Sequence, residues 1–227
     1  CTTFPYDSLY ENAIKYLKGQ GFSIVEGPNC RVNIGEGKSN TPEKCAEEIN
    51  DFMTSDKSDV VISCGGGELM CEDLPFVDFD RISKAEPKWY VGYSDNTNFT
   101  FLLNTLCDTA SIYGPSVCDF GAIPRCAHTD DLMEIMMGKK DTVTNYEKWE
   151  IEQIRDESNP LMGFNLTEDY KQTISGNKEM AGNFSGRLIG GCLDILVLIA
   201  GSKFDKVEEF IKKYEDDGII WFMEACD

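Results

Sequence analysis

A serine in this chain stands where a strand is expected to end and a helix to begin. Residues 92–97 read GYSDNT and follow the apolar run that starts at Trp89. This strand–turn–helix setting is that of a nucleophile elbow, although the pattern is G-x-S-x-N rather than G-x-S-x-G. Such a turn raises the Ser94 hydroxyl at the top of the sheet and directs the Asp95 N–H into the same space. The alternative is that Ser94 is only a helix cap, because Ser, Asp, Asn and Thr are all ordinary capping residues.

A second turn whose backbone could take part in catalysis or binding follows the β-branched run over residues 59–63. Gly65, Gly66 and Gly67 allow the backbone to turn sharply and leave N–H groups accessible to an anion or an oxyanion. The segment is not a phosphate-binding P-loop, since no Gly-Lys-Ser/Thr follows, and it lacks the dinucleotide-binding GxGxxG pattern. The plain alternative is a tight strand-to-helix turn.

A serine nucleophile needs a base, normally a histidine that a carboxylate orients. The chain contains one histidine, His128, in the polar stretch 124–130 before a helix predicted over 132–137. We interpret His128 as a structural surface residue and predict that it is not the base. Glu224 directly follows the apolar run 219–223 and is expected at the carboxyl end of a strand, where ligands collect in α/β sheets. A solvated carboxylate is the alternative for Glu224.

The elements that position these residues alternate between helix and strand from about residue 9 to residue 140. This alternation is typical of an α/β fold with a parallel sheet. Apolar residues at helical spacing predict helices over 8–18, 41–53 and 97–107. Short apolar runs bounded by turn residues predict strands over 22–25, 59–63, 89–92 and 111–113.

The pattern predicts two domains. Residues 1–145 form the N-terminal α/β domain that carries the nucleophile. Residues 146–182 are polar with isolated aromatics, and we interpret them as an interdomain connection. A regular secondary-structure pattern returns at 187–191, continues with a short apolar helix and ends in a predicted buried strand over 219–223. Residues 183–227 are therefore expected to begin a C-terminal domain that carries Glu224.

Composition narrows the class of function. The 227 residues contain 21 Lys and Arg against 40 Asp and Glu, a formal net charge of −19. Binding to nucleic acid or to an anionic membrane surface draws on Lys and Arg, so neither partner is expected. The longest apolar stretch, 193–200, is far shorter than the ~20 residues of a membrane span. No membrane association is predicted.

Ten cysteines do not indicate a disulfide framework in a chain of this length. Several of them fall in apolar runs, where cysteine behaves as a small buried hydrophobe. The chain has no CxxC pair and a single histidine, so the usual ligand spacing of a zinc site is missing. We predict reduced thiols, a cytoplasmic protein, no metal and no cofactor.

Several blocks of the sequence resemble the LD-carboxypeptidases, and within them the branch that includes the microcin C immunity-type peptidases. The blocks occur in the family's order and span essentially the whole chain: Gly66-Gly67, 74–82 (LPFVDFDRI), 87–95 (PKWYVGYSD), 113–115 (YGP), 188–191 (LIGG) and 221–224 (WFME). The resemblance implies a flavodoxin-like parallel-sheet domain, a smaller C-terminal α/β domain that is incomplete in this chain, and a homodimer.

The same resemblance implies a serine peptidase with a Ser–Glu–His triad. Ser94 matches the nucleophile and Glu224 the orienting acid, and the oxyanion donors would be the Asp95 N–H and a backbone N–H of Gly66 or Gly67. The family histidine lies well after the acid, so the triad histidine is not in this chain. The family's first strand should precede Cys1. Both departures predict that the chain is part of a longer protein.

A third departure concerns the residues after the double glycine. Residues 192–194 read CLD where the family more usually has Asn-Leu-Ser, so a substrate contact there is not expected to be retained.

These observations predict a serine carboxypeptidase or amidase that cleaves an amide bond next to a terminal residue. By resemblance, the substrate is a murein tetrapeptide with a terminal D-residue or an aminoacyl-nucleotide antibiotic conjugate. The alternative is a non-catalytic relative that binds peptides in the same cleft but lacks the base.

Overall fold

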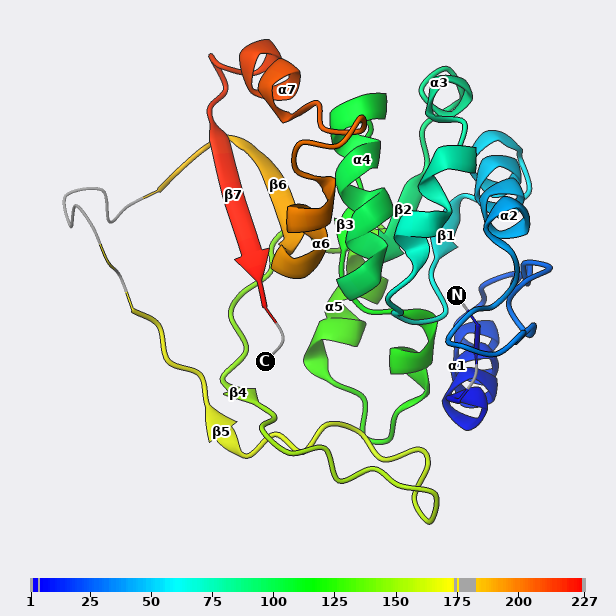
Figure 1. Ribbon diagram of the computed structural model, residues 1–227. Helices are drawn as coiled ribbons and strands as arrows, with labels where there is room; N and C mark the ends of the chain where they lie inside the picture. The colour runs from blue at the N-terminus through cyan, green and yellow to red at the C-terminus, as the bar shows by residue number, and fades with distance from the viewer. Residues whose placement is uncertain (1, 4, 174, 176–182, 226–227) are drawn as a thin grey trace.

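The computed structural model describes residues 2–3, 5–173, 175 and 183–225 (Figure 1). The helices are α1 (Asp7–Gly19), α2 (Pro42–Thr54), α3 (Phe79–Ile82), α4 (Thr97–Cys107), α5 (Ala127–Met136), α6 (Leu193–Ile199) and α7 (Val207–Lys213). Short 3-10 helices are η1 (Met70–Glu72), η2 (Leu74–Phe76), η3 (Ser94–Asn96) and η4 (Val117–Gly121). The strands are β1 (Val60–Ile62), β2 (Trp89–Gly92), β3 (Ile112–Tyr113), β4 (Lys148–Trp149), β5 (Glu168–Asp169), β6 (Arg187–Cys192) and β7 (Ile219–Glu224).

Three short parallel strands form the sheet that carries Ser94. Its order is β1-β2-β3, with Val61 paired to Tyr90 and Gly92 paired to Tyr113. Parallel strands place their carboxyl ends at one edge of the sheet, so the turns that follow β1, β2 and β3 lie together there. The fold class predicted from the sequence, a mixed α/β protein with a parallel sheet, is confirmed.

Helix α4 connects this sheet to the last part of the chain. Phe99 and Leu103 are fully buried in a core cluster with Tyr90 of β2. Phe101 and Leu102, on the opposite side of α4, pack with Ile189 of β6 in a separate cluster. Figure 1 shows α4 between the two groups of strands, with β6 and β7 on its other side. Residues 97–103 of α4 are all buried, the polar ones included, as expected for a helix with both faces covered.

Strands β6 and β7 form a second, two-stranded parallel sheet. Cys192 pairs with Glu224 at its end, and the Cys192 N–H donates a hydrogen bond of 3.0 Å to Thr97 Oγ1. Thr97 is the first residue of α4 and lies three positions after Ser94. The register of β6–β7 therefore brings Glu224 to the start of α4.

Gly191 makes this close approach possible. Its φ is +144°, and a Cβ built on it would lie 2.5 Å from Thr97 Cγ2. We expect Gly191→Ala to destabilise the fold by about 2 kcal/mol, since an added methyl group must push β6 away from α4. The measurement is the denaturant-unfolding midpoint. Gly19→Ala is the matched control, because a Cβ there meets nothing within 4 Å and is expected to leave the midpoint near that of the wild type.

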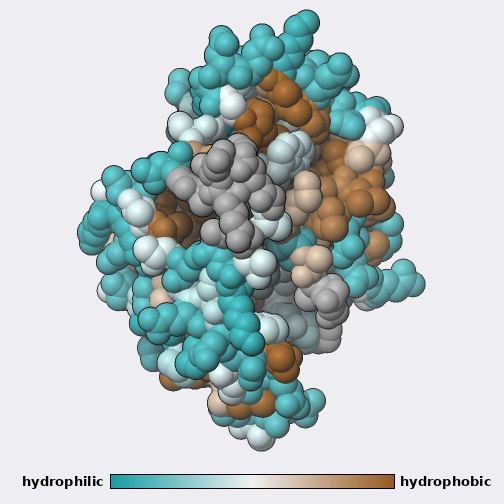
Figure 2. Space-filling model, turned by 90° about the vertical axis from the view of Figure 1, so that its left-hand side faces the viewer, coloured by the Kyte–Doolittle hydropathy of each residue, from teal (hydrophilic) through white to brown (hydrophobic). Residues whose placement is uncertain are grey.

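Strands β6 and β7 and helix α6 expose several large apolar side chains. Figure 2 shows hydrophobic side chains gathered on the side of the molecule where β7 lies in Figure 1. The exposed large hydrophobic residues of this part of the chain are Leu188, Leu193, Val197, Leu198, Trp221 and Met223. They lie on both faces of the sheet, because Leu188 pairs with Ile220 whereas Trp221 pairs with the buried Ile189, and the Trp221 ring lies 6.1 Å from that of Phe101 on α4.

Two predictions of local structure are wrong. Residues 22–25 alternate between half-buried and exposed positions, as predicted for a strand, but no described backbone pairs with them, and a strand exists only through its ladder. The helix predicted over 132–137 begins at Ala127, so His128 lies on α5 rather than in a loop. The polar stretch 146–182 has little regular structure in its described part, where β4 and β5 form one antiparallel pair. The domain boundaries remain a prediction.

Candidate active site

Ser94 lies on a strained turn between β2 and α4. Its φ is +59°, a left-handed conformation that residues other than glycine rarely adopt. Strain of this kind persists only where the surroundings enforce it. Here a buried amide does so: Asn96 accepts a 2.7 Å hydrogen bond from Tyr90 Oη and donates one of 3.0 Å to the Gly65 carbonyl. Asn96 occupies the position of the second glycine in the G-x-S-x-G pattern. Its hydrogen bond to Gly65 connects the Ser94 turn to the glycine turn after β1.

The glycine turn lies directly beside the serine side chain. A Cβ built on Gly66 would lie 3.6 Å from both Cβ and Oγ of Ser94. Gly66 and Gly67 are exposed, and no hydrogen bond among the described residues uses either of their N–H groups. The structure therefore brings together Ser94 and the two glycines that the sequence selected as backbone donors.

The carboxylate of Asp95 lies beside the glycine turn, where a Cβ built on Gly67 would come within 2.9 Å of its Oδ2. It is buried, at 4% exposure, and its Oδ2 accepts the Met70 N–H at 3.1 Å while its Oδ1 accepts an Asn98 Nδ2 hydrogen at 3.0 Å. Burial raises the pKa of this carboxyl, which the two donors partly offset. The side chain thus anchors the turn, and in the described structure the Asp95 N–H makes no hydrogen bond.

Glu224 reaches the serine turn through a tyrosine. The Tyr113 hydroxyl donates a 2.5 Å hydrogen bond to Glu224 Oε1 and accepts the Ser94 N–H at 3.0 Å. Burial raises the pKa of the Tyr113 phenol, and the Glu224 carboxylate raises it further, so the hydroxyl stays protonated. Glu224 is the last residue of β7 rather than the residue after it. The sequence placed Tyr113 at the end of a strand and in one of the blocks that resemble the family, 113–115, but gave it no role in the site.

His128 is placed among aromatic rings. Its imidazole lies edge-on to Tyr146 and Phe164, with ring centroids 6.0 and 5.7 Å away. Burial lowers its pKa, which favours the neutral ring. The described residues include no hydrogen bond between His128 and Ser94. That His128 is not the base remains a prediction.

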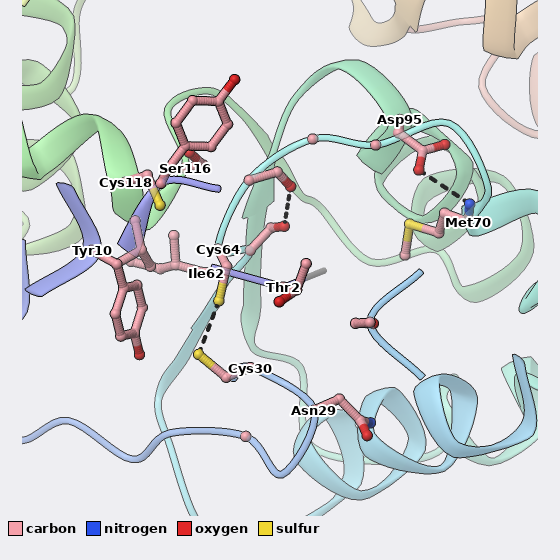
Figure 3. Close-up of a pocket in the computed structure, with 18 of the residues that line it drawn as sticks. Thr2, Tyr10, Asn29, Cys30, Ile62, Cys64, Met70, Asp95, Ser116 and Cys118 are labelled. Carbon is pink, nitrogen blue, oxygen red and sulfur yellow. Dashed lines mark hydrogen bonds between the residues drawn. The ribbon is translucent and has the colours of Figure 1, made fainter. Parts of the chain in front are cut away.

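A cavity of about 810 Å³ opens beside the serine turn, and Ser94, Asp95 and the glycines 65–67 are among its lining residues. Figure 3 shows Asp95 bonded to Met70 on one side of it and Cys30 facing Cys64 on another, where the two sulfur atoms lie 3.3 Å apart. The same cavity extends away from the serine turn along α1, α2 and β1, where apolar side chains such as Ile14, Phe52 and Ile62 line it. The candidate nucleophile is therefore accessible to a substrate.

The described cysteines are free thiols: Cys30, Cys45, Cys64, Cys71, Cys107, Cys118, Cys126 and Cys192. Cys1 and Cys226 lie outside the described residues. In the part of the chain that the structure describes, no three His, Cys, Asp or Glu side chains are grouped to hold a metal ion. Among the same residues, no helix combines the length and apolarity needed to cross a membrane.

Comparison with known proteins identifies the family. The family model described as the LD-carboxypeptidase N-terminal domain matches residues 2–114, which include Ser94 and the glycine turn. The microcin C7 self-immunity protein MccF of Escherichia coli is 27% identical over 197 residues. This chain belongs to the LD-carboxypeptidase family, and MccF is one of its similar relatives.

Solved structures share the fold. MccF in complex with adenosine monophosphate superposes with a TM-score of 0.75 at 25% identity, over 98% of this chain and 64% of that chain. An MccF-like protein from Streptococcus pneumoniae, also in complex with AMP, gives a TM-score of 0.69 at 22% identity, over 97% and 68%. The sequence match to MccF covers 84% of this chain and 56% of MccF, so the chain spans little more than half of that relative.

Proposed function

We propose that this chain carries the nucleophile and the orienting acid of a serine peptidase or amidase. The observation that supports this most is the strained Ser94 turn, which lies against Gly66 and is joined through one hydroxyl to Glu224. A mere helix cap has no need of positive φ, because capping residues ordinarily adopt extended backbone. Ser94 would attack the scissile carbonyl, and a histidine from outside this chain would take its proton.

The backbone around Ser94 suits the charge that forms during acyl transfer. The tetrahedral intermediate carries a negative oxygen, which needs hydrogen-bond donors fixed in advance. The N–H groups of Asp95, Gly66 and Gly67 make no hydrogen bond among the described residues, and Gly66 lies directly beside the serine side chain. One such donor typically contributes about 3–4 kcal/mol of transition-state stabilisation.

For the substrate, we propose an aminoacyl-nucleotide conjugate, with a murein tetrapeptide as the other candidate. The relatives favour the first: structures of MccF contain aspartyl sulfamoyl adenosine and glutamyl sulfamoyl guanosine. Ser94 borders the cavity, so a conjugate bound there could reach the serine hydroxyl. We also retain the proposals of a cytoplasmic location and a homodimer. Light scattering of the full-length protein would test the homodimer, and cell fractionation would test the location.

The test is incubation of the full-length protein with an aminoacyl sulfamoyl adenosine and, separately, with a murein tetrapeptide. Mass spectrometry follows release of the free amino acid. Cleavage of either compound by the wild type supports a peptidase or amidase and identifies its substrate class. Binding of the conjugate without cleavage would instead indicate the non-catalytic alternative. If the protein neither binds nor cleaves either compound, the proposal is overturned.

A further inference from the structure

We propose that Tyr113 is a positioning residue that fixes the distance between the serine turn and the acid strand. This inference rests on the proposed function. The Tyr113 hydroxyl is the one described group that bonds both to the backbone of Ser94 and to the carboxylate of Glu224. Ser94 follows β2 of the first sheet, Glu224 ends β7 of the second, and Tyr113 is separated from Glu224 by 111 residues of sequence.

The bonding capacity of the phenol makes this link directional. A protonated phenol has one hydrogen to donate, and here Glu224 Oε1 receives it. Its oxygen accepts the Ser94 N–H, which holds the strained turn in addition to the hydrogen bonds of Asn96. The ring is held as well, since it packs 5.2 Å from Phe222, two residues before Glu224 on β7. The hydroxyl therefore cannot move without shifting β7 or the serine turn.

This arrangement assigns separate tasks to the two carboxylate oxygens. Oε1 of Glu224 is engaged by Tyr113, and no described residue bonds to Oε2. Oε2 is then the oxygen that can accept the ring N–H of the base. A donor on Oε1 also draws charge away from the carboxylate, which lowers the pKa of the base that the carboxylate supports.

The first test is Tyr113→Phe in the full-length protein. We expect kcat to fall about 10- to 100-fold with KM nearly unchanged, because a charge-assisted hydrogen bond is lost from the positioning of the catalytic groups. The acidic limb of the kcat/KM profile should move to higher pH, since Glu224 then supports the protonated base more strongly. A merely structural tyrosine would lower the profile without moving its midpoint. Tyr146→Phe is the control, as that phenol also bonds a carboxylate, Asp131, but on α5.

The second test does not depend on activity. Tyr113→Phe and Glu224→Ala each remove the same hydrogen bond, so the double variant should melt within about 2 °C of the less stable single variant. Additive losses in melting temperature, or an unmoved acidic limb in an active enzyme, would overturn the role of Tyr113. If the wild type cleaves nothing, the proposed function fails, and the melting temperatures still decide whether Tyr113 joins the two strands.

Discussion

Ser94→Ala in the full-length protein is expected to lower kcat about 10⁴-fold or more, with KM for the substrate nearly unchanged. In serine hydrolases the nucleophile cannot be replaced by another group, and its loss removes the whole triad contribution while binding and backbone donors remain. The Ser94 side chain makes no hydrogen bond within the described residues, and it borders the cavity. Its removal should therefore leave the melting temperature close to that of the wild type.

Covalent labelling gives a second readout of the same change. A fluorophosphonate probe should modify the wild type at Ser94 and leave Ser94→Ala unmodified. Ser83→Ala is the matched control, since Ser83 is an exposed serine at the end of α3 that bonds only to the Asp80 carbonyl. Equal labelling of wild type and Ser94→Ala, or retention of turnover in Ser94→Ala, would rule out Ser94 as the nucleophile.

The parts of the site that the sequence predicted are those whose signals are local. The strand over 89–92, the turn at Ser94 and the helix over 97–107 follow one another within 19 residues, and each boundary has its own signal in glycine, polar caps or apolar spacing. The glycine turn is equally local. Its contact with Ser94 follows from parallel pairing of β1 and β2, which any βαβ arrangement imposes.

What the sequence could not show depends on contacts between distant segments. Nothing near Tyr113 indicates that its hydroxyl bonds Glu224, because the register of β6–β7 and its packing on α4 set that distance. The strand predicted over 22–25 failed for the same reason: its alternation is present, but a ladder needs a neighbour that local pattern cannot supply. The short helix α3 was not predicted, since four residues are too few for a periodic signal.

Glu224→Gln is expected to lower kcat about 10⁴-fold in the full-length protein, with little effect on KM. The amide is nearly the same size as the carboxylate, so the fold should be preserved. Its oxygen can still accept the Tyr113 hydroxyl, but its NH₂ group then faces the position from which the base must donate its ring N–H. Two donors repel each other, and the base is driven to the wrong tautomer, as with the acid-to-amide change in other serine triads.

Comparison of Glu224→Gln with two other variants distinguishes a loss of base orientation from a general loss of structure. Tyr113→Phe leaves the carboxylate in place and should retain more activity than Glu224→Gln by about 10²-fold. Glu208→Gln, an exposed acid on α7, should behave as wild type. The Ser94 hydroxyl remains in Glu224→Gln, so a fluorophosphonate should still label it, only more slowly. Turnover within about threefold of wild type in Glu224→Gln would show that Glu224 does not orient the base, because an amide cannot substitute for the charge that stabilises an imidazolium.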